Sequence, residues 1–314
     1  MTSITSSARA ALMAPRWRGH RGRVEVWYAT LTDRRTGTGV WVHHETVAPK
    51  DDEPPYAHGW TAVFAPDAPP VVERFGPGPV APAAPETWHA VGGCELRQSS
   101  LRGTAGSLSW DLTLDETSDP LFTFPRAVWE RELLPGAQIV PAPDSTFSGT
   151  VAVDGRPLPI EGPGALARIY GHGSAHRWGW LHADLDGEGC LEIVTATARR
   201  AALRRLPPLA LVQLRLPGRP DWPVHPLVTA PRFRTRLRPD GFDVRGGTRR
   251  QHLTVQVDLP AADVVGLRYV DPDGETATCT NSERAHARIG LTEGAQERWW
   301  ELHSIAHAEV GRRP

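Results

Sequence analysis

The chain has 314 residues, which is enough for one large domain or two ordinary ones. Hydrophobic residues make up 40% of it and charged residues 23%, the balance of an ordinary globular protein. The formal net charge of −1 excludes a global electrostatic field that would draw the protein to nucleic acid or to an anionic membrane.

Residues 1–21 are expected to form a disordered tail. Their apolar run, Ala10 to Met13, is too short for the hydrophobic region of a signal peptide. No later window is apolar enough over 18 residues to span a membrane. Cys94, Cys190 and Cys279 are scattered, which argues against a disulfide framework or a zinc knuckle and favours a reducing compartment. We therefore expect a cytoplasmic protein without an integral membrane segment.

Short runs of alternating apolar and polar residues then follow one another, separated by turn residues. The first hairpin is VEVWYATLTD, the turn RTGTG and VWVHHETVA. The further predicted strand regions are HGWTAVFAP, LRGTAGSLSWDLTLD, STFSGTVAVDG, HRWGWLHADLDGEGCLEIVTATA, LVQLRL, GFDVRGGTRRQHLTVQVDL, DVVGLRYVDPDGETATC and RWWELHSIAHAEVG. Helical periodicity is rare: Pro125–Leu133 is the best candidate, and Glu283–Ile289 is either a helix or turns. The pattern predicts an all-β sandwich or barrel with few short helices.

The hairpin of Val24–Val47 has a counterpart in RWGWLHADLDGEGCLEIV, because each pairs a tryptophan-bearing strand with a turn and a return strand. This similarity predicts two alike β-barrel domains with a boundary near residue 160. We expect an N-terminal barrel over residues 22–160 and a C-terminal barrel over residues 161–314.

Alternation along a strand sorts the side chains of YGHGSAHRWGWLHADLDGEG onto two faces. Trp178, Trp180, His182 and Asp184 share one face, because residues two apart in a strand point the same way. Such a face is either an amphipathic outer surface or a cavity wall with aromatic groups and a few polar ones, as in pockets for lipophilic ligands. The structural alternative for each tryptophan is a plug whose indole N–H bonds a carbonyl. The first hairpin repeats this arrangement with two further sets: Glu25 and Trp27, then Trp41, His43 and Glu45.

Four segments carry a resemblance to a known family: EVWYATLTDRRTGTGVWV, FSGTVAVDGRPLPI, HRWGWLHADLDG and the closing WWELHSIAHAEVG, in that order. The chain resembles the lipocalin-like carotenoid hydratases (hydroxyneurosporene synthases), which are related to tocopherol cyclases and to lipocalin-type Diels–Alderases. The resemblance implies two calycin-type antiparallel β-barrels packed together, with a lipophilic small molecule bound between or inside them. It also implies chemistry without a metal or organic cofactor. This chain departs from the family pattern at YGHGSAHRW, where His172 and His176 are added.

A metal site built from His172, His176 and His182 is the weaker chemical hypothesis, because these residues lie in a glycine-rich loop that enters a strand. The stronger hypothesis is acid–base catalysis. Protonating an alkene requires an acid with a raised pKa and aromatic faces that shield the cation. Asp184 or His182 could supply the acid, with Glu25 and Glu45 as second choices. A structural or rim role is the alternative for each.

Other chemistries lack their motifs. There is no GxSxG elbow, and the glycine-rich segments lack the setting of a phosphate loop. The basic stretches RGGTRR and RRAALRR carry no interleaved aromatic residues, so we interpret them as solvated faces and expect no nucleic-acid partner.

The sequence therefore predicts a cofactor-independent hydratase, cyclase or isomerase that acts on a terpenoid or polyketide-like lipophile. A non-catalytic lipophile carrier is the alternative. An enzyme should hold an ionisable group with a shifted pKa inside the apolar cavity, whereas a carrier should keep its polar groups at the rim. The predicted substrate-binding residues are Trp27, Trp41, His172, His176, Trp178 and Trp180. The oligomeric state is left open.

Overall fold

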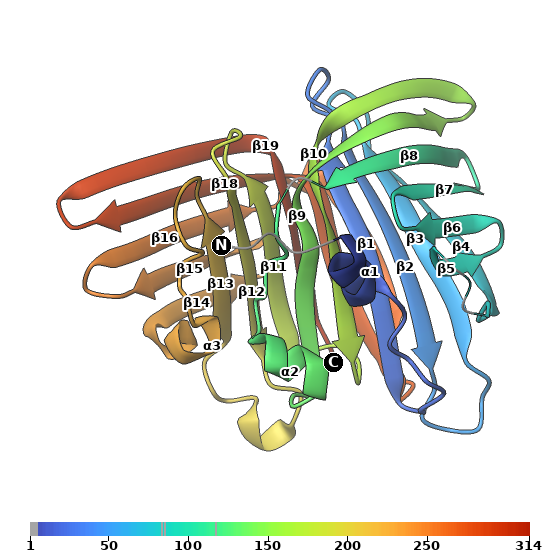
Figure 1. Ribbon diagram of the computed structural model, residues 1–314, viewed down its shortest axis with the longest axis horizontal. Coiled ribbons are helices and arrows are strands. Elements are labelled where there is room, and N and C mark those ends of the chain that lie inside the picture. Colours follow the sequence, from blue (N-terminus) through green and yellow to red (C-terminus); the bar gives the residue numbers. More distant parts are fainter. Residues whose placement is uncertain (1–5, 83, 85, 117) are drawn as a thin grey trace. The chain divides into compact units, whose positions relative to one another are not determined.

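A computed structural model describes residues 6–82, 84, 86–116 and 118–314. The chain forms two compact units. Unit 1 comprises Met1–Leu121, Ala127–Gly173 and Asp271–Gly274, and unit 2 comprises Phe122–Arg126, Ser174–Val270 and Glu275–Pro314. Both are built almost wholly from antiparallel strands, so the predicted all-β class with few short helices is confirmed (Figure 1).

Unit 1 contains a sheet in the order β4-β3-β2-β1-β10-β9-β8-β7-β6-β5. The edge strands β4 and β5 approach each other, which nearly closes the sheet into a barrel. Its elements are α1 (Ser6–Met13), β1 (Arg23–Thr32), β2 (Gly39–Ala48), β3 (Tyr56–Phe64), β4 (Val71–Pro79), β5 (Thr87–Val91), β6 (Cys94–Arg97), β7 (Ser100–Ala105), β8 (Leu108–Glu116), β9 (Gly136–Val153) and β10 (Arg156–Gly171), with α2 (Arg126–Arg131) between β8 and β9.

Unit 2 contains a sheet in the order β13-β12-β11-β19-β18-β16-β15-β14, and β17 pairs with β18. Strands β13 and β14 approach each other at its edges. Its elements are β11 (Arg177–Asp184), β12 (Cys190–Thr197), η1 (Ala201–Leu203), β13 (Leu209–Arg215), α3 (Pro226–Thr229), η2 (Ala230–Arg232), β14 (Phe233–Arg238), β15 (Gly241–Gly247), β16 (Gln251–Asp258), η3 (Ala261–Asp263), β17 (Val265–Val270), β18 (Thr276–Glu293) and β19 (Gln296–Arg312).

The two predicted tryptophan hairpins both form. β1 pairs with β2 over Arg23–Thr32, and β11 pairs with β12 through a turn at Leu185–Gly189. Gly189 suits this turn because its φ is +121° and a Cβ there would lie 2.0 Å from the carbonyl oxygen of Arg215. The helix predicted over Pro125–Leu133 is α2.

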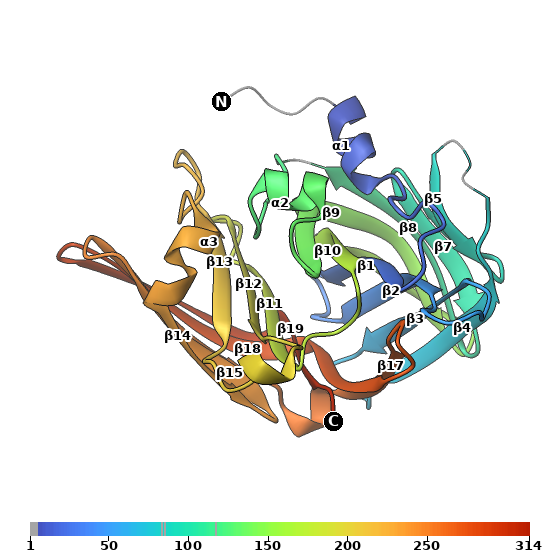
Figure 2. The same cartoon turned by 90° about the horizontal axis from the view of Figure 1, so that it is seen from below.

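Two expectations were wrong. Glu283–Ile289 is neither a helix nor a set of turns but the middle of β18, where β-bulges between Ser282 and Ala287 disturb the alternation that identifies a strand. The tail is ordered in its described part: α1 covers Ser6–Met13 and lies against unit 1 (Figure 2), and residues 1–5 lie outside the described residues. None of the helices in the described chain is long and apolar enough to cross a membrane.

The tryptophan-bearing face of the first strand enters the core in unit 1 but lies opposite the core in unit 2. In unit 1, Trp27, Ala29 and Leu31 of β1 enter the core, together with Val40 and Val42 of β2. In unit 2, Leu181 and Ala183 of β11 enter the core. Trp178, Trp180, His182 and Asp184 do share one face, as alternation predicts, and it is the face opposite the unit 2 core.

Candidate functional site

Most of the predicted site residues fall into three groups, one beside the cavity of unit 1, one on the opposite face of β2, and one on unit 2. Glu25 and Trp27 belong to the first group. Trp41 and Glu45 lie on the second face, and Trp178, Trp180 and His182 on the third. The structure thus keeps apart residues that the sequence pattern treats alike.

A cavity of about 590 Å³ occupies one end of the unit 1 barrel. Its wall contains three tryptophans, Trp17, Trp27 and Trp88, together with prolines and small apolar residues from the N-terminal segment, from β3, β4 and β5, and from the connections beside these strands. The ionisable residues in the wall are Arg18, Glu25 and His89. The volume lies within the range of small-molecule sites, and an apolar, aromatic wall with few polar groups is typical of them.

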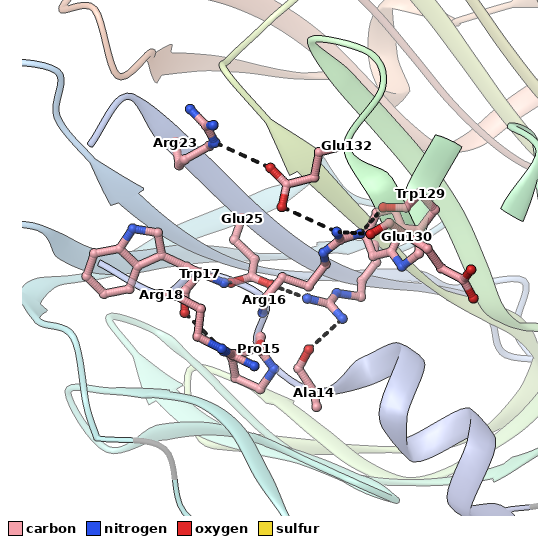
Figure 3. A network of polar contacts seen from close by, with 11 residues as sticks. Ala14, Pro15, Arg16, Trp17, Arg18, Arg23, Glu25, Trp129, Glu130 and Glu132 are labelled. Atoms are coloured by element: carbon pink, nitrogen blue, oxygen red, sulfur yellow. Dashed lines mark hydrogen bonds and ion pairs between the residues drawn. The ribbon is translucent and has the colours of Figure 1, made fainter. Parts of the chain in front are cut away.

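Glu25 holds the N-terminal segment in place beside this cavity (Figure 3). Its Oε1 accepts the backbone N–H of Arg16 at 2.6 Å, and its Oε2 accepts the backbone N–H of Trp17 at 3.0 Å. The side chain is buried and pairs with the guanidinium of Arg168. With three N–H donors on its oxygens, Glu25 is arranged as a positioning carboxylate rather than as a proton donor.

Arg168 completes the attachment. Burial lowers its pKa to about 10, while Glu25 raises it, so the guanidinium stays protonated at neutral pH. It also donates to the carbonyl oxygens of Leu12 and, at 2.7 Å, Ala14. The indole N–H of Trp27 donates to the carbonyl oxygen of Met13 at 2.9 Å. These bonds explain why the tail is ordered from α1 onward and forms one side of the cavity.

His89 lies in the cavity wall, and its hydrogen bonds fix the position of its proton. Its Nε2 is 3.1 Å from the backbone carbonyl oxygen of Glu45, which can only accept, so Nε2 carries the proton. Its Nδ1 is 3.1 Å from Nδ1 of His44 and therefore accepts from that residue. The remaining nitrogen, Nε2 of His44, is buried and has no hydrogen-bond partner among the described residues.

The imidazoles of His44 and His89, which form this hydrogen-bonded pair, are both neutral near pH 7. Burial lowers the pKa of His89 to about 4. Burial also lowers the pKa of His44 well below its ordinary value, and the neighbouring His89 and His43 lower it further. A neutral imidazole beside an aromatic cavity is a proton acceptor, and the Trp27 ring lies 5.8 Å from the His89 ring.

The second group lies on the other face of β2. Nε2 of His43 is 3.1 Å from Oε2 of Glu45, and Nε2 of His58 is 3.9 Å from the same oxygen. Burial raises the pKa of Glu45 and lowers that of His43 to about 3. The ring of Trp41 lies 5.0 Å from that of His43. A carboxyl group with a raised pKa against a neutral imidazole is an acid–base pair.

The third group forms a row across four adjacent strands of unit 2. Glu192 of β12, His182 of β11 and His307 of β19 are directly cross-strand partners, and Glu283 of β18 extends the row. Nδ1 of His182 is 3.0 Å from Glu192, and Nδ1 of His307 is 2.6 Å from Glu283. All four side chains are buried. Each histidine is oriented by a carboxylate, the arrangement that directs a catalytic or metal-binding imidazole.

The tryptophans of this face bond carboxylates of the same sheet. Trp180 donates its indole N–H to Oε1 of Glu192 at 2.6 Å, and Trp178 donates to Oε1 of Glu309 at 2.7 Å. Burial raises the pKa of Glu309 and that of the neighbouring thiol of Cys279. The indoles therefore have polar partners here, which is the structural role weighed against ligand contact.

Asp184, the first-choice acid, lies at the turn after β11. Its Oδ1 accepts the backbone N–H of Gly187 at 2.9 Å, so it stabilises the turn, and its side chain is partly exposed. His172 belongs to unit 1, where its Nδ1 lies 3.0 Å from Arg23, whereas His176 belongs to unit 2. Within the described residues, no three potential ligand side chains converge to hold a metal ion.

Comparisons with known proteins agree with this architecture. Residues 104–312 match the family described as tocopherol cyclase-like. The uncharacterized protein Rv0493c of Mycobacterium tuberculosis strain ATCC 25618 / H37Rv is 47% identical over 312 residues, which is 99% of this chain and 92% of that protein. The fold is similar to kievitone hydratase from Nectria haematococca (11% identity, TM-score 0.59, covering 91% and 88% of the two chains). It is also similar to CghA (11% identity, TM-score 0.61, covering 93% and 88%).

The sequence pattern did not identify several residues of these groups. Glu192, His307 and Glu309 lie in predicted strand regions, whereas Glu283 lies in the stretch that was expected to form a helix or turns. Glu192 meets His182 across the β11–β12 hairpin, but His307 and Glu309 meet β11 only through the pairing of β19 with that strand. The cavity residues Trp17, Trp88 and His89 lie in the presumed tail and in an unrecognised strand. For Trp88 and His89, the alternation of TWHAV was the one available signal.

Proposed function

Because the chain belongs to the tocopherol cyclase-like family, we propose that it is a cofactor-independent hydratase, cyclase or isomerase. Its substrate would be a lipophilic terpenoid or polyketide-like small molecule. The observation that carries the proposal is the cavity of about 590 Å³ in unit 1, lined by Trp17, Trp27 and Trp88. Its size and wall suit a lipophile of drug-like dimensions.

The proposed chemistry follows from the side chains in that wall. Protonation of a substrate alkene forms one C–H bond and leaves a cation on the neighbouring carbon, which the indole faces stabilise. Water adds to that cation in a hydration, and an internal nucleophile adds in a cyclisation. Loss of a neighbouring proton gives an isomerisation. His89 lies in the wall and is neutral because burial lowers its pKa to about 4, and it takes up the released proton only if its Nδ1 gives up the hydrogen bond from His44.

The proposed reaction also needs a side chain that protonates the alkene. Glu45 carries a raised pKa, but its side chain lies on the opposite face of β2 from Val40 and Val42, which enter the barrel core. Of the two acids predicted on unit 2, His182 remains a proposed acid, with Glu192 orienting it, whereas the carboxylate of Asp184 holds the turn after β11 and is not assigned as the acid. Glu25 is proposed to position the N-terminal segment, and Trp41, Trp178, Trp180, His172 and His176 remain proposed substrate contacts.

The alternative function is a non-catalytic lipophile carrier. The pairing of Glu25 with Arg168 favours it, since that pair neutralises the charge beside the cavity. His89 favours the enzyme, because an ionisable group with a displaced pKa lies within the wall itself.

Two steps test the proposal. Native mass spectrometry of the purified full chain should detect a bound lipophile, which Trp27→Ala should lose and the exposed-site control Trp299→Ala should keep. Incubation of that lipophile with the wild type should change its mass by one water or alter its chromatographic retention. His89→Asn should bind it but convert it at least about 100-fold more slowly. Recovery of an unaltered lipophile from the wild type would establish the carrier instead.

A further inference from the structure

Unit 2 exposes a concentration of large apolar side chains on two connecting segments. Leu203 lies in η1, Leu206 follows it before β13, and Leu209 begins β13, with Leu206 57% exposed. Val224 and Val228 lie in and before α3 and are 70% and 68% exposed. Ala201–Pro207 is an unbroken exposed run. Single exposed leucines are ordinary, but such a group marks an interaction surface.

These apolar residues lie among arginines. Residues 199–232 contain seven arginines, no lysine or glutamate, and one aspartate. That aspartate, Asp221, pairs with Arg215, and Arg219 pairs with Glu293. Arg200, Arg204 and Arg205 are exposed beside Leu203 and Leu206. We call the exposed leucines, valines and arginines of residues 199–232 the arginine–leucine surface. The net charge of −1 for the whole chain conceals this local positive charge.

The two segments lie toward one end of unit 2. After β13 the chain turns back, because Leu214 and Trp222 form an antiparallel bridge and Gln213 donates to the carbonyl oxygen of Pro223 at 2.8 Å. It therefore runs along β13 toward the end at which the η1 segment enters that strand. Figure 1 shows α3 and the yellow η1 segment at the lower end of the unit 2 strands.

We propose that the arginine–leucine surface docks the protein on a bilayer of anionic phospholipid. Exposed leucine and valine side chains can enter the interface of the bilayer, and arginines beside them pair with headgroup phosphates. A second copy of this chain fits the surface poorly, because two arginine-rich surfaces repel each other. Nucleic acid would leave the leucines and valines without an apolar partner. This inference does not depend on the proposed catalytic function.

The test is co-sedimentation of the full chain with vesicles of phosphatidylglycerol and phosphatidylcholine, compared with vesicles of phosphatidylcholine alone. The wild type should bind the anionic vesicles, and salt should weaken the binding. Arg200→Glu/Arg205→Glu should bind at least about 20-fold more weakly, at about fivefold for each arginine. The matched control Arg249→Glu/Arg250→Glu changes the net charge equally at the exposed loop before β16 and should keep wild-type binding.

A second pair of variants tests how much the exposed leucine side chains contribute to vesicle binding. Leu203→Asn/Leu206→Asn should weaken vesicle binding, while Val270→Asn, at an exposed apolar site elsewhere in unit 2, should not. Circular dichroism checks that each variant is folded. The proposal is overturned if the wild type does not bind anionic vesicles, or if both surface variants bind as the wild type does. It is also overturned if the wild type dimerises and the surface variants are monomeric without a change in vesicle binding.

Discussion

The two barrels differ in whether ionisable groups reach the barrel interior. Unit 1 has such groups in its cavity wall as well as on the opposite face of β2, where His43 and Glu45 lie. Unit 1 holds Glu25, Arg168 and His89 beside or within its interior cavity. The interior of unit 2 is packed with Leu, Val, Ile, Ala and Phe side chains, and its buried histidines and glutamates lie on the other sheet face. One architecture thus supports a barrel with a cavity at one end of its packed core, which suits ligand binding, and a barrel whose interior is filled by aliphatic and aromatic side chains.

The two interiors are lined by different side chains. In unit 2, branched aliphatic residues such as Leu181, Val255 and Ile289 fill the space between strands. In unit 1, Trp27 and Trp88 line the cavity together with alanine and proline residues, while aliphatic side chains such as Leu101 and Leu112 fill the rest of the core.

The largest effect is expected from truncating the filled core. Phe242 is completely buried in unit 2, and Phe242→Ala should lower the free energy of unfolding of that unit by about 3–5 kcal/mol. Trp88→Ala should cost less, because that ring already borders a cavity. Hydrogen exchange of each unit in urea measures both effects, and an equal or larger cost for Trp88→Ala would contradict the contrast.

Removing one partner of the buried ion pair should be nearly as severe. Arg168→Met leaves the carboxylate of Glu25 buried without its cation, at a cost of about 3–5 kcal/mol in the stability of unit 1. Glu25→Gln/Arg168→Met should recover much of that loss, because no isolated charge remains. A double variant no more stable than Arg168→Met in urea would show that the pair does not act as a unit.

Acid should loosen unit 1 before unit 2. The pKa of His89 is about 4 in the folded protein, below its ordinary value of 6.5, because burial disfavours the charged form. Its contribution to stability is complete above about pH 6.5 and is lost as the pH falls toward 4, an effect on the order of 3 kcal/mol. His43 and His58 act in the same direction, and the raised pKa of Glu45 opposes them.

Hydrogen exchange at pH 7.5 and pH 5 measures this difference between the units. His89→Asn should reduce the pH dependence of protection in unit 1, whereas His303→Asn, at an exposed site of unit 2, should leave it unchanged. Earlier loss of protection in unit 2 would contradict the assignment of neutral buried histidines to unit 1.

The smallest effect is expected at Asp184. Its carboxylate accepts the N–H of Gly187 in the turn after β11, so Asp184→Asn, which keeps an oxygen acceptor, should change stability by less than about 1 kcal/mol. Turnover of the bound lipophile should remain within about threefold of the wild type. A loss of turnover above about 100-fold without a loss of stability would restore Asp184 as the acid.

The sequence predicted the strands, and the residues that share a strand face, better than it predicted which face of a strand enters the barrel. Alternation correctly grouped Trp178, Trp180 and His182, because side chains two apart in a strand point the same way. Alternation could not tell which face enters the barrel. That choice depends on how the sheet curves and on the residues that alternate with the tryptophans, such as Leu181 and Ala183, which enter the core of unit 2. Trp27 points inward and Trp41 outward, although the two strands look alike in sequence.

The remaining site residues could not be predicted, because their contacts depend on parts of the chain that are far apart in sequence. His307 meets His182 because β19 pairs with β11, more than a hundred residues earlier in the chain. The bulges in β18 displaced Glu283 from simple alternation. The N-terminal segment has no strand periodicity, and its order depends on Glu25 and Arg168, which its own sequence does not reveal.

A crystal structure of the full chain with its co-purified or substrate-like lipophile tests the central claim most directly. We predict electron density for the lipophile in the unit 1 cavity, against Trp27 and Trp88 and within reach of His89. Density confined to the Trp178, Trp180 and His182 face of unit 2, with the unit 1 cavity free of ligand, would contradict the account.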